Sequence, residues 1–400
     1  MRNRYLDLLR AAATVRVVVY HSSGWAALTI VFPAMSVMFA LAGSMMAASL
    51  DRYGPFAVER RLHRLLPALW LLAAVAVPMM LIGGMAWEWQ VLLWAFPLED
   101  PPAAGFWLEG LAATWYLRDF LWFVLLSPLL LPLFRRFPLT TLTLPYAALA
   151  LITFTGATTH VIARDLALYG GAWLLGFAHH DGLLARRPAR SAARRLIAPP
   201  SRLSTSPAAE SASRAVWSAT RASPAALSCS SAGSEALVRG AALARYRWWI
   251  VGVLAATAAA WAVTHPGPRG YDLNDIPLAN ALWSAAFILV ALSVSPRVAP
   301  RRILTVLNAR ALSIYLWHVP LIIIVVRFAE ATGLPVHGWV GISWRLAVVS
   351  VLLAIVVMLV GWVEDISAGR RPSLLPGATR RVAPVSPAPT GAVDLQRAGR

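Results

Sequence analysis

The chain has 400 residues, of which 58% are hydrophobic and only 14% are charged, and its mean hydropathy is +0.63. Soluble domains are about 45–50% apolar and about 25% charged, so this composition excludes an ordinary soluble protein and indicates one that spans a membrane. The formal net charge is +18, but most arginines lie in short connections between apolar segments, which indicates membrane topology rather than nucleic-acid binding.

Apolar segments of nearly the length that crosses a bilayer recur along the chain, and we expect about ten membrane-spanning helices. Arginines gather in alternate connections, and the positive-inside rule then places both termini in the cytoplasm. The expected fold is therefore all-α, a polytopic helical bundle that crosses the cell membrane many times. The expected spans lie at about 7–26, 28–50, 65–84, 115–134, 140–158, 166–184, 248–264, 277–295, 311–329 and 344–363.

The first expected span, within YLDLLRAAATVRVVVYHSSGW, carries Arg10 and His21 eleven residues apart. Eleven steps of about 100° bring a helix to within roughly 20° of its starting direction, so both side chains lie along one stripe. Because ionisable groups inside a bilayer cost about 2.5–3.5 kcal/mol each, such residues favour a functional role. His21 can accept a proton from a hydroxyl, and Arg10 can hold an anionic or carbonyl group. The alternative is that Arg10 reaches the inner interface beside Asp7 and His21 lies at the outer interface.

The segment ERRLHRLLPALW leads into the third expected span and carries Arg60, Arg61 and Arg64. Arg61 and Arg64 are three residues apart and so neighbour each other on a helix. A cluster of guanidinium groups suits phosphate binding. A plain positive anchor for lipid headgroups explains the same residues.

Two stretches depart from the pattern of spans. Residues 85–114 are apolar and rich in tryptophan, which favours a segment at the membrane interface over an eleventh span. Residues 185–247 are basic and rich in Ser, Ala and Pro, so we expect a disordered cytoplasmic insertion, with a similar tail at 366–400. The membrane domain then comprises residues 1–184, with six spans, and 248–365, with four.

The ninth expected span, within ARALSIYLWHVPLIIIV, has Tyr315, Trp317 and His318 near its middle. These side chains can line a cavity shared with the first span, or they can hydrogen-bond between helices as a purely structural feature. The histidines elsewhere show no spacing that suggests a metal site.

Taken together, these segments resemble the acyltransferase-3 family, polytopic membrane enzymes that acylate hydroxyls of cell-surface glycans and secondary metabolites. The resemblance covers about residues 5–365, interrupted by the insertion, and rests on DLLRAAATVRVVVYH, FPAMSVMFALAGSMMAASL, RRLHRLLPALW and LSIYLWHVPL in that order. The second piece departs from the family, because it reads FALAG where relatives often have F-F-x-x-S-G. The resemblance implies a site with His21 and Arg10 as catalytic residues, Arg60, Arg61 and Arg64 on the acyl-CoA side, and Tyr315, Trp317 and His318 near the substrate.

The implied reaction moves an acyl group, most often acetyl, from cytoplasmic acyl-CoA to a hydroxyl of a carbohydrate or other acceptor. Acyl-CoA is then a co-substrate, and no bound cofactor or metal is expected. His21 acts as the general base or forms a transient acyl-histidine. Transfer is direct or passes to a separate extracytoplasmic partner protein. The alternatives are a permease or exporter in which Arg10 and His21 relay an anion or proton, and a non-catalytic relative that serves as a scaffold.

Overall fold

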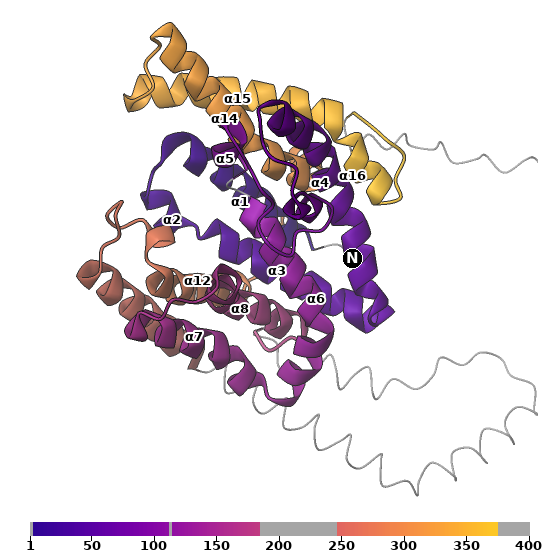
Figure 1. The fold of residues 1–400 in the computed structure, drawn as a ribbon. Helices are drawn as coiled ribbons and strands as arrows, with labels where there is room; N and C mark the ends of the chain where they lie inside the picture. Colours follow the sequence, from indigo (N-terminus) through magenta and orange to yellow (C-terminus); the bar gives the residue numbers. More distant parts are fainter. Residues whose placement is uncertain (1–2, 112–113, 185–245, 375–400) are drawn as a thin grey trace, which may run out of the picture.

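The computed structural model describes residues 3–111, 114–184 and 246–374. Figure 1 shows these residues as a bundle of helices. Within the described residues the regular elements are all helical, and the one β-bridge is an isolated pair between Gly267 and Gly270. The expected all-α polytopic bundle is confirmed.

Eight described helices are long and apolar enough to cross a membrane. Two further expected spans are present as helices, α1 (Arg4–Ser23) and the shorter α12 (Pro277–Ala291). The eight are Ala27–Tyr53, which contains α2 (Ala27–Val31) and α3 (Ala34–Tyr53), then Phe56–Ile82 (α4), Trp115–Arg136 (α6), Pro138–Thr155 (α7), Val161–His180 (α8), Tyr246–Thr264, Ala311–Thr332 (α14) and Gly338–Val360 (α15). The short elements are η1 (Trp89–Trp94), α5 (Phe106–Gly110), η4 (Leu273–Asp275), α13 (Arg302–Ala309) and α16 (Trp362–Ser367).

Helix α1 lies in the middle of the bundle, between α3 on one side and α14 and α15 on the other (Figure 1). It begins at a cap in which the Asn3 side chain accepts a hydrogen bond from the Tyr5 N–H at 3.1 Å, and it ends at Gly24, whose φ of 70° suits glycine. Because other helices surround it, the arginines inside the helix contact protein: Arg10 contacts Met45, and Arg16 donates to the Leu28 carbonyl oxygen. This position explains how a helix with three arginines and an aspartate is accommodated in a membrane bundle.

The tightest helix contact joins α3 and α8. At Gly176 an added Cβ atom would lie 2.1 Å from the Ala40 carbonyl oxygen, and at Gly43 it would lie 2.3 Å from the Trp173 carbonyl oxygen. Small residues allow helix backbones to approach this closely in membrane proteins. The Ser44 hydroxyl and His179 Nδ1 add a 2.9 Å hydrogen bond across the same pair of helices.

The ends of the helices form two distinct faces of the bundle. We call one face the arginine-rich end, because it holds the connection from α3 to α4 with Arg60, Arg61 and Arg64, and the last turn of α6. The other face, called the opposite end, holds the end of α1 and the loop with η4. The assignment of the arginine-rich end and both termini to the cytoplasm stays a prediction.

The two irregular stretches have different outcomes. Of the stretch 85–114, residues 85–111 include the short helices η1 and α5, with Trp94 and Trp107 buried in one apolar cluster with α4, whereas Trp87 and Trp89 are exposed. The expected insertion at 185–247 and tail at 366–400 lie outside the described residues, apart from 246–247 and 366–374.

Candidate functional site

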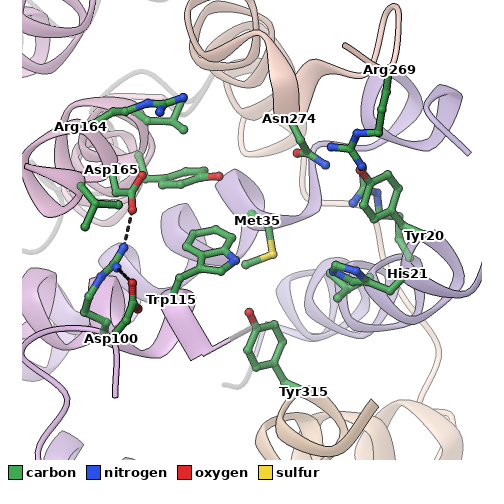
Figure 2. Close-up of a pocket in the computed structure, with 16 residues that line it drawn as sticks. Tyr20, His21, Met35, Asp100, Trp115, Arg164, Asp165, Arg269, Asn274 and Tyr315 are labelled. Atoms are coloured by element: carbon green, nitrogen blue, oxygen red, sulfur yellow. Dashed lines mark hydrogen bonds and ion pairs between the residues drawn. The ribbon is translucent and has the colours of Figure 1, made fainter. Parts of the chain in front are cut away.

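A polar cavity of about 420 Å³ lies at the opposite end of the bundle, among α1, α6, α8, α14 and the loop with η4. Its wall combines aromatic rings with charged groups, among them Tyr20, His21, Trp115, Arg164, Asp165 and Tyr315. Figure 2 shows His21 and Asp165 on facing sides, with Trp115 between them. Such a wall can hydrogen-bond a polar molecule and stack against its apolar faces.

His21 lies in the last turn of α1, and its ring is open to this cavity. The ring contacts Tyr20 edge to face, with centroids 5.2 Å apart, and it contacts His318 of α14, also with centroids 5.2 Å apart. The structure therefore brings together two histidines that are far apart in the sequence. An imidazole held between ring neighbours and open to a polar cavity is suited to proton transfer.

A hydrogen-bonded loop forms one wall beside His21. The Tyr20 hydroxyl donates to Asp272 Oδ2 at 2.6 Å and accepts from Arg269 Nη1 at 3.0 Å. Arg269 also donates to both carboxylate oxygens of Asp275, at 2.9 and 2.7 Å. These two hydrogen bonds hold the pKa of the Asp275 carboxyl below its usual value. The loop is thus fastened to α1 through charged groups.

The far wall is organised by Arg118 of α6, which is fully buried. Its Nε donates to Asp119 Oδ1 at 2.9 Å, and its two terminal nitrogens donate to Asp100 and Asp165. A buried guanidinium needs this kind of compensation, because an unpaired buried charge is strongly destabilising. Arg118 therefore fixes the start of α8 and the segment before α6 around the cavity.

Arg16 is the arginine that α1 contributes to the cavity. Its Nε donates to the Leu28 carbonyl oxygen at 3.1 Å, and its guanidinium lies 4.7 Å from the centre of the Tyr20 ring. The side chain is buried, and it makes no ion pair with a carboxylate of the described residues. Arg16 is thus a cation beside His21 that can interact with negative charge on a bound substrate. The sequence did not indicate this role, because Arg16 lies on a different face of α1 from Arg10 and His21.

Arg10 lies three turns away from His21 along α1 and does not line the cavity. Its Nη2 is 2.7 Å from Met45 Sδ, and its positive charge interacts electrostatically with Arg61 and with Tyr116. Arg10 thus lies near the arginines at the start of α4, on the side of the bundle remote from His21. The two ends of the expected Arg10–His21 stripe belong to different surroundings.

Three more arginines near Arg10 lie at the start of α4. Arg61 is partly buried and donates to the Ser49 hydroxyl at 3.4 Å, whereas Arg60 stacks 4.1 Å from the centre of the Tyr53 ring. Arg64 is exposed, and its positive charge repels that of Arg61. With Arg10 these side chains form a group that we call the arginine cluster. A group of guanidinium ions at one end of a membrane bundle is suited to bind phosphates.

The three residues singled out in α14 have different surroundings. Tyr315 lines the cavity, His318 lies against His21, and Trp317 packs against two apolar clusters away from the cavity. Tyr315 also contacts Tyr116, with ring centroids 5.0 Å apart. Both rings are buried, and Tyr315 also lines the cavity.

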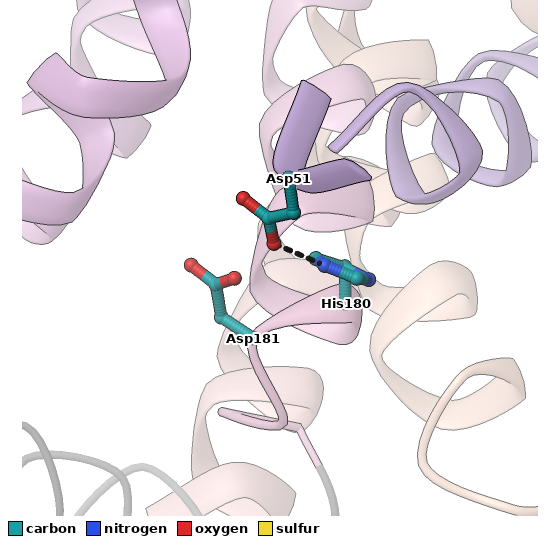
Figure 3. Close-up of side chains that lie close together, drawn as sticks. All are labelled: Asp51, His180 and Asp181. Atoms are coloured by element: carbon teal, nitrogen blue, oxygen red, sulfur yellow. Dashed lines mark hydrogen bonds and ion pairs between the residues drawn. The ribbon is translucent and has the colours of Figure 1, made fainter. Parts of the chain in front are cut away.

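One further group of described residues resembles a metal site. Figure 3 shows Asp51, His180 and Asp181 close together at the arginine-rich end. Arg135 donates to both carboxylates, with distances of 2.8 and 2.7 Å, and His180 Nε2 lies 2.8 Å from Asp51. The guanidinium neutralises the carboxylates that a cation would need. We interpret the group as an ion-pair cluster that joins the ends of α3, α6 and α8.

Comparison with known proteins identifies one relationship. The model of the acyltransferase-3 family, described as an acyltransferase domain, matches residues 3–363. No curated protein and no solved structure matches the chain. The matched range includes the cavity around His21 and the arginine cluster.

Proposed function

The chain belongs to the acyltransferase-3 family and is a multi-pass membrane acyltransferase, and on that premise we propose that it transfers an acetyl group from acyl-CoA to a hydroxyl of a cell-surface glycan or similar acceptor. The observation that carries this proposal is the position of His21, which is open to a polar cavity inside a membrane bundle. A base that is open to such a cavity can meet the hydroxyl of an acceptor bound there.

The walls of the cavity suit an acceptor rich in hydroxyl groups. Carboxylates accept hydrogen bonds from hydroxyls and guanidinium groups donate to them, and Asp165 and Arg164 supply one of each. Trp115 adds a flat apolar surface between these polar groups and His21, and Tyr20 adds another on the His21 side of the cavity. This combination of aromatic rings with charged hydrogen-bonding groups favours a sugar as the acceptor.

The arginine cluster suits the other substrate. Coenzyme A carries several phosphates, and guanidinium groups bind phosphates through paired, charge-assisted hydrogen bonds. Arg10, Arg60, Arg61 and Arg64 lie at the end of the bundle that the positive-inside rule assigns to the cytoplasm. In this proposal the phosphates stay at the cluster and the acyl-pantetheine arm extends past Tyr116 and Tyr315 to His21.

In the proposed reaction the acyl group passes directly from CoA to the acceptor oxygen beside His21. His21 removes the proton from the acceptor hydroxyl as that oxygen attacks the thioester carbonyl carbon. The carbon–sulfur bond breaks, and the CoA thiolate takes the proton back from His21. Negative charge develops on the carbonyl oxygen, and Arg16 is the cation beside His21 that can stabilise it. Arg10 then serves to position the donor, and an acyl-histidine intermediate is the variant of the same chemistry.

The experiment that tests this function uses purified protein in lipid nanodiscs with acetyl-CoA. Release of free CoA thiol is followed for the wild type, His21→Ala and the control His160→Ala, which alters an exposed histidine at the cap of α8. Free hexoses and N-acetylhexosamines are then added as acceptors. Release that requires His21 and rises with a sugar supports the proposal. The absence of both CoA release and acetyl-CoA binding would overturn the proposal in favour of a permease.

A further inference from the structure

His318 occupies an unusual position for a polar side chain. It lies in α14, is fully buried, and places Nδ1 2.6 Å from the backbone carbonyl oxygen of Tyr315. A carbonyl oxygen only accepts hydrogen bonds, so Nδ1 must carry the proton in this contact. In the neutral ring the lone pair is then on Nε2. The backbone of α14 thus fixes the tautomer of His318.

The Nε2 atom of His318 is buried and has no hydrogen-bond partner among the residues that the structure describes. An unsatisfied buried acceptor costs about 1–3 kcal/mol, so a fully buried one calls for an explanation. Two polar rings lie beside that of His318: the His21 ring, with its centroid 5.2 Å away at an interplanar angle of 58°, and the Tyr315 ring, with its centroid 5.5 Å away. Tyr315 is already tied to His318 through its backbone carbonyl, so His21 is the partner that Nε2 can gain. A small rotation of the His21 ring, or one bridging water, is enough to connect the two imidazoles.

We propose that His318 is a positioning residue for His21. Its Nε2 lone pair accepts the N–H of one His21 ring nitrogen, which leaves the other nitrogen of His21 unprotonated and facing the cavity. The proposal rests on the proposed role of His21 as the base that takes the acceptor proton. It assigns to His318 a role distinct from substrate contact, because the ring is fully buried and does not line the cavity.

The surroundings favour a neutral partner for His21 over a carboxylate. Arg16 and Arg269 place positive charge near His21, and a carboxylate beside the ring would pair with these arginines instead. A histidine whose tautomer is fixed by a backbone carbonyl supplies an acceptor without adding charge. When His21 takes a proton from the acceptor, the same Nε2 lone pair stabilises the imidazolium that forms.

Two substitutions separate a positioning role from simple space filling. The amide of an asparagine can replace Nδ1 and keep the bond to the Tyr315 carbonyl, but it leaves no acceptor at the Nε2 position. The amide of a glutamine reaches the Nε2 position and can offer its oxygen to His21. We expect His318→Asn to lower the kcat of CoA release from acetyl-CoA by about 100-fold with an unchanged KM, and His318→Gln to recover at least about tenfold of this loss.

A second measurement does not depend on turnover. With 15N-labelled histidine, NMR of the imidazole nitrogens reports the tautomer of each ring, and His21→Ala and His318→Asn assign the two signals. We expect one tautomer of His21 in the wild type and a mixture in His318→Asn. Size-exclusion chromatography confirms that each variant is folded.

The outcomes distinguish this proposal from the proposed function. Equal loss of kcat in both His318 variants, with the His21 tautomer unchanged, would show that His318 only fills space and would overturn the inference. If the wild type releases no CoA, the proposed function fails. The NMR result alone then decides whether His318 orients His21.

Discussion

Arg16 and His21 line the same cavity, and the Tyr20 ring lies in contact with both of them. This arrangement places a permanent positive charge next to an imidazole in a cavity at one end of a membrane bundle. A guanidinium stays charged in any protein environment, so it can stabilise negative charge that appears during a reaction at His21.

We therefore expect Arg16→Gln to lower the kcat of acyl transfer by about 100-fold while leaving acetyl-CoA binding unchanged. Arg16→Lys keeps the charge and should retain more activity. Steady-state kinetics of CoA release, measured alongside acetyl-CoA binding, tests this. A kcat for Arg16→Gln equal to that of the wild type would show that Arg16 does not stabilise charge in the reaction.

The arginine cluster should affect a different kinetic constant. Loss of a charge-assisted hydrogen bond to a phosphate in Arg61→Gln should raise the KM for acetyl-CoA by about tenfold, with little change in kcat. Arg136→Gln is a control, because Arg136 is an arginine at the same arginine-rich end that lies on α6, outside the arginine cluster. Equal effects of the two substitutions would indicate a general charge effect in place of a donor site.

The contact between α3 and α8 predicts a stability effect. Gly176→Ala would place a Cβ atom 2.1 Å from the Ala40 carbonyl oxygen, so the helices must separate, at a cost of about 1–3 kcal/mol. Gly252 is a control, because an added Cβ there meets open space. We expect thermal unfolding in detergent to occur earlier for Gly176→Ala and not for Gly252→Ala. The reverse order would contradict the close approach of α3 and α8.

The loop beside His21 should loosen in acid. The pKa of Asp275 is lower in the folded protein than its usual 3.8, because Arg269 hydrogen-bonds to the carboxylate. The ion pair therefore stabilises the loop fully above pH 3.8, and this contribution is lost as the pH falls through the lowered pKa. Hydrogen exchange of residues 266–276 should rise over that range. In Asp275→Asn it should already be raised at neutral pH, and identical profiles for both proteins would exclude the ion pair as the cause.

The hydropathy of the sequence predicted most of the helices, because eight of them are apolar enough to be recognised on their own. Helix α1 matches the apolar segment expected at 7–26 but is not among those eight, and its central position accounts for its polarity. The 3.6-residue period also placed Arg10 and His21 on one stripe of α1. A common stripe does not make a common site, because the neighbours differ along the length of the helix.

The rest of the cavity depends on long-range contacts that no local pattern reports. Asp272 reaches Tyr20 across 252 positions of sequence, and His318 meets His21 from another helix. Arg118 and its three carboxylates come from three separate segments. The polar character of individual residues gave a signal in the sequence, but their assembly into one wall could not be predicted without the packing of α1, α6, α8 and α14.

The Tyr116–Tyr315 contact has a consequence for the electrical integrity of the membrane. Polar sites at both ends of a bundle invite ion leakage, and each elementary charge that crosses 100 mV dissipates about 2.3 kcal/mol. The buried rings of Tyr116 and Tyr315 are in contact, and close-packed apolar rings oppose the passage of hydrated ions. In the proposed route an uncharged pantetheine arm passes them and leaves the CoA phosphates behind. Acyl transfer by this route moves no net charge, so its rate should not depend on the membrane potential.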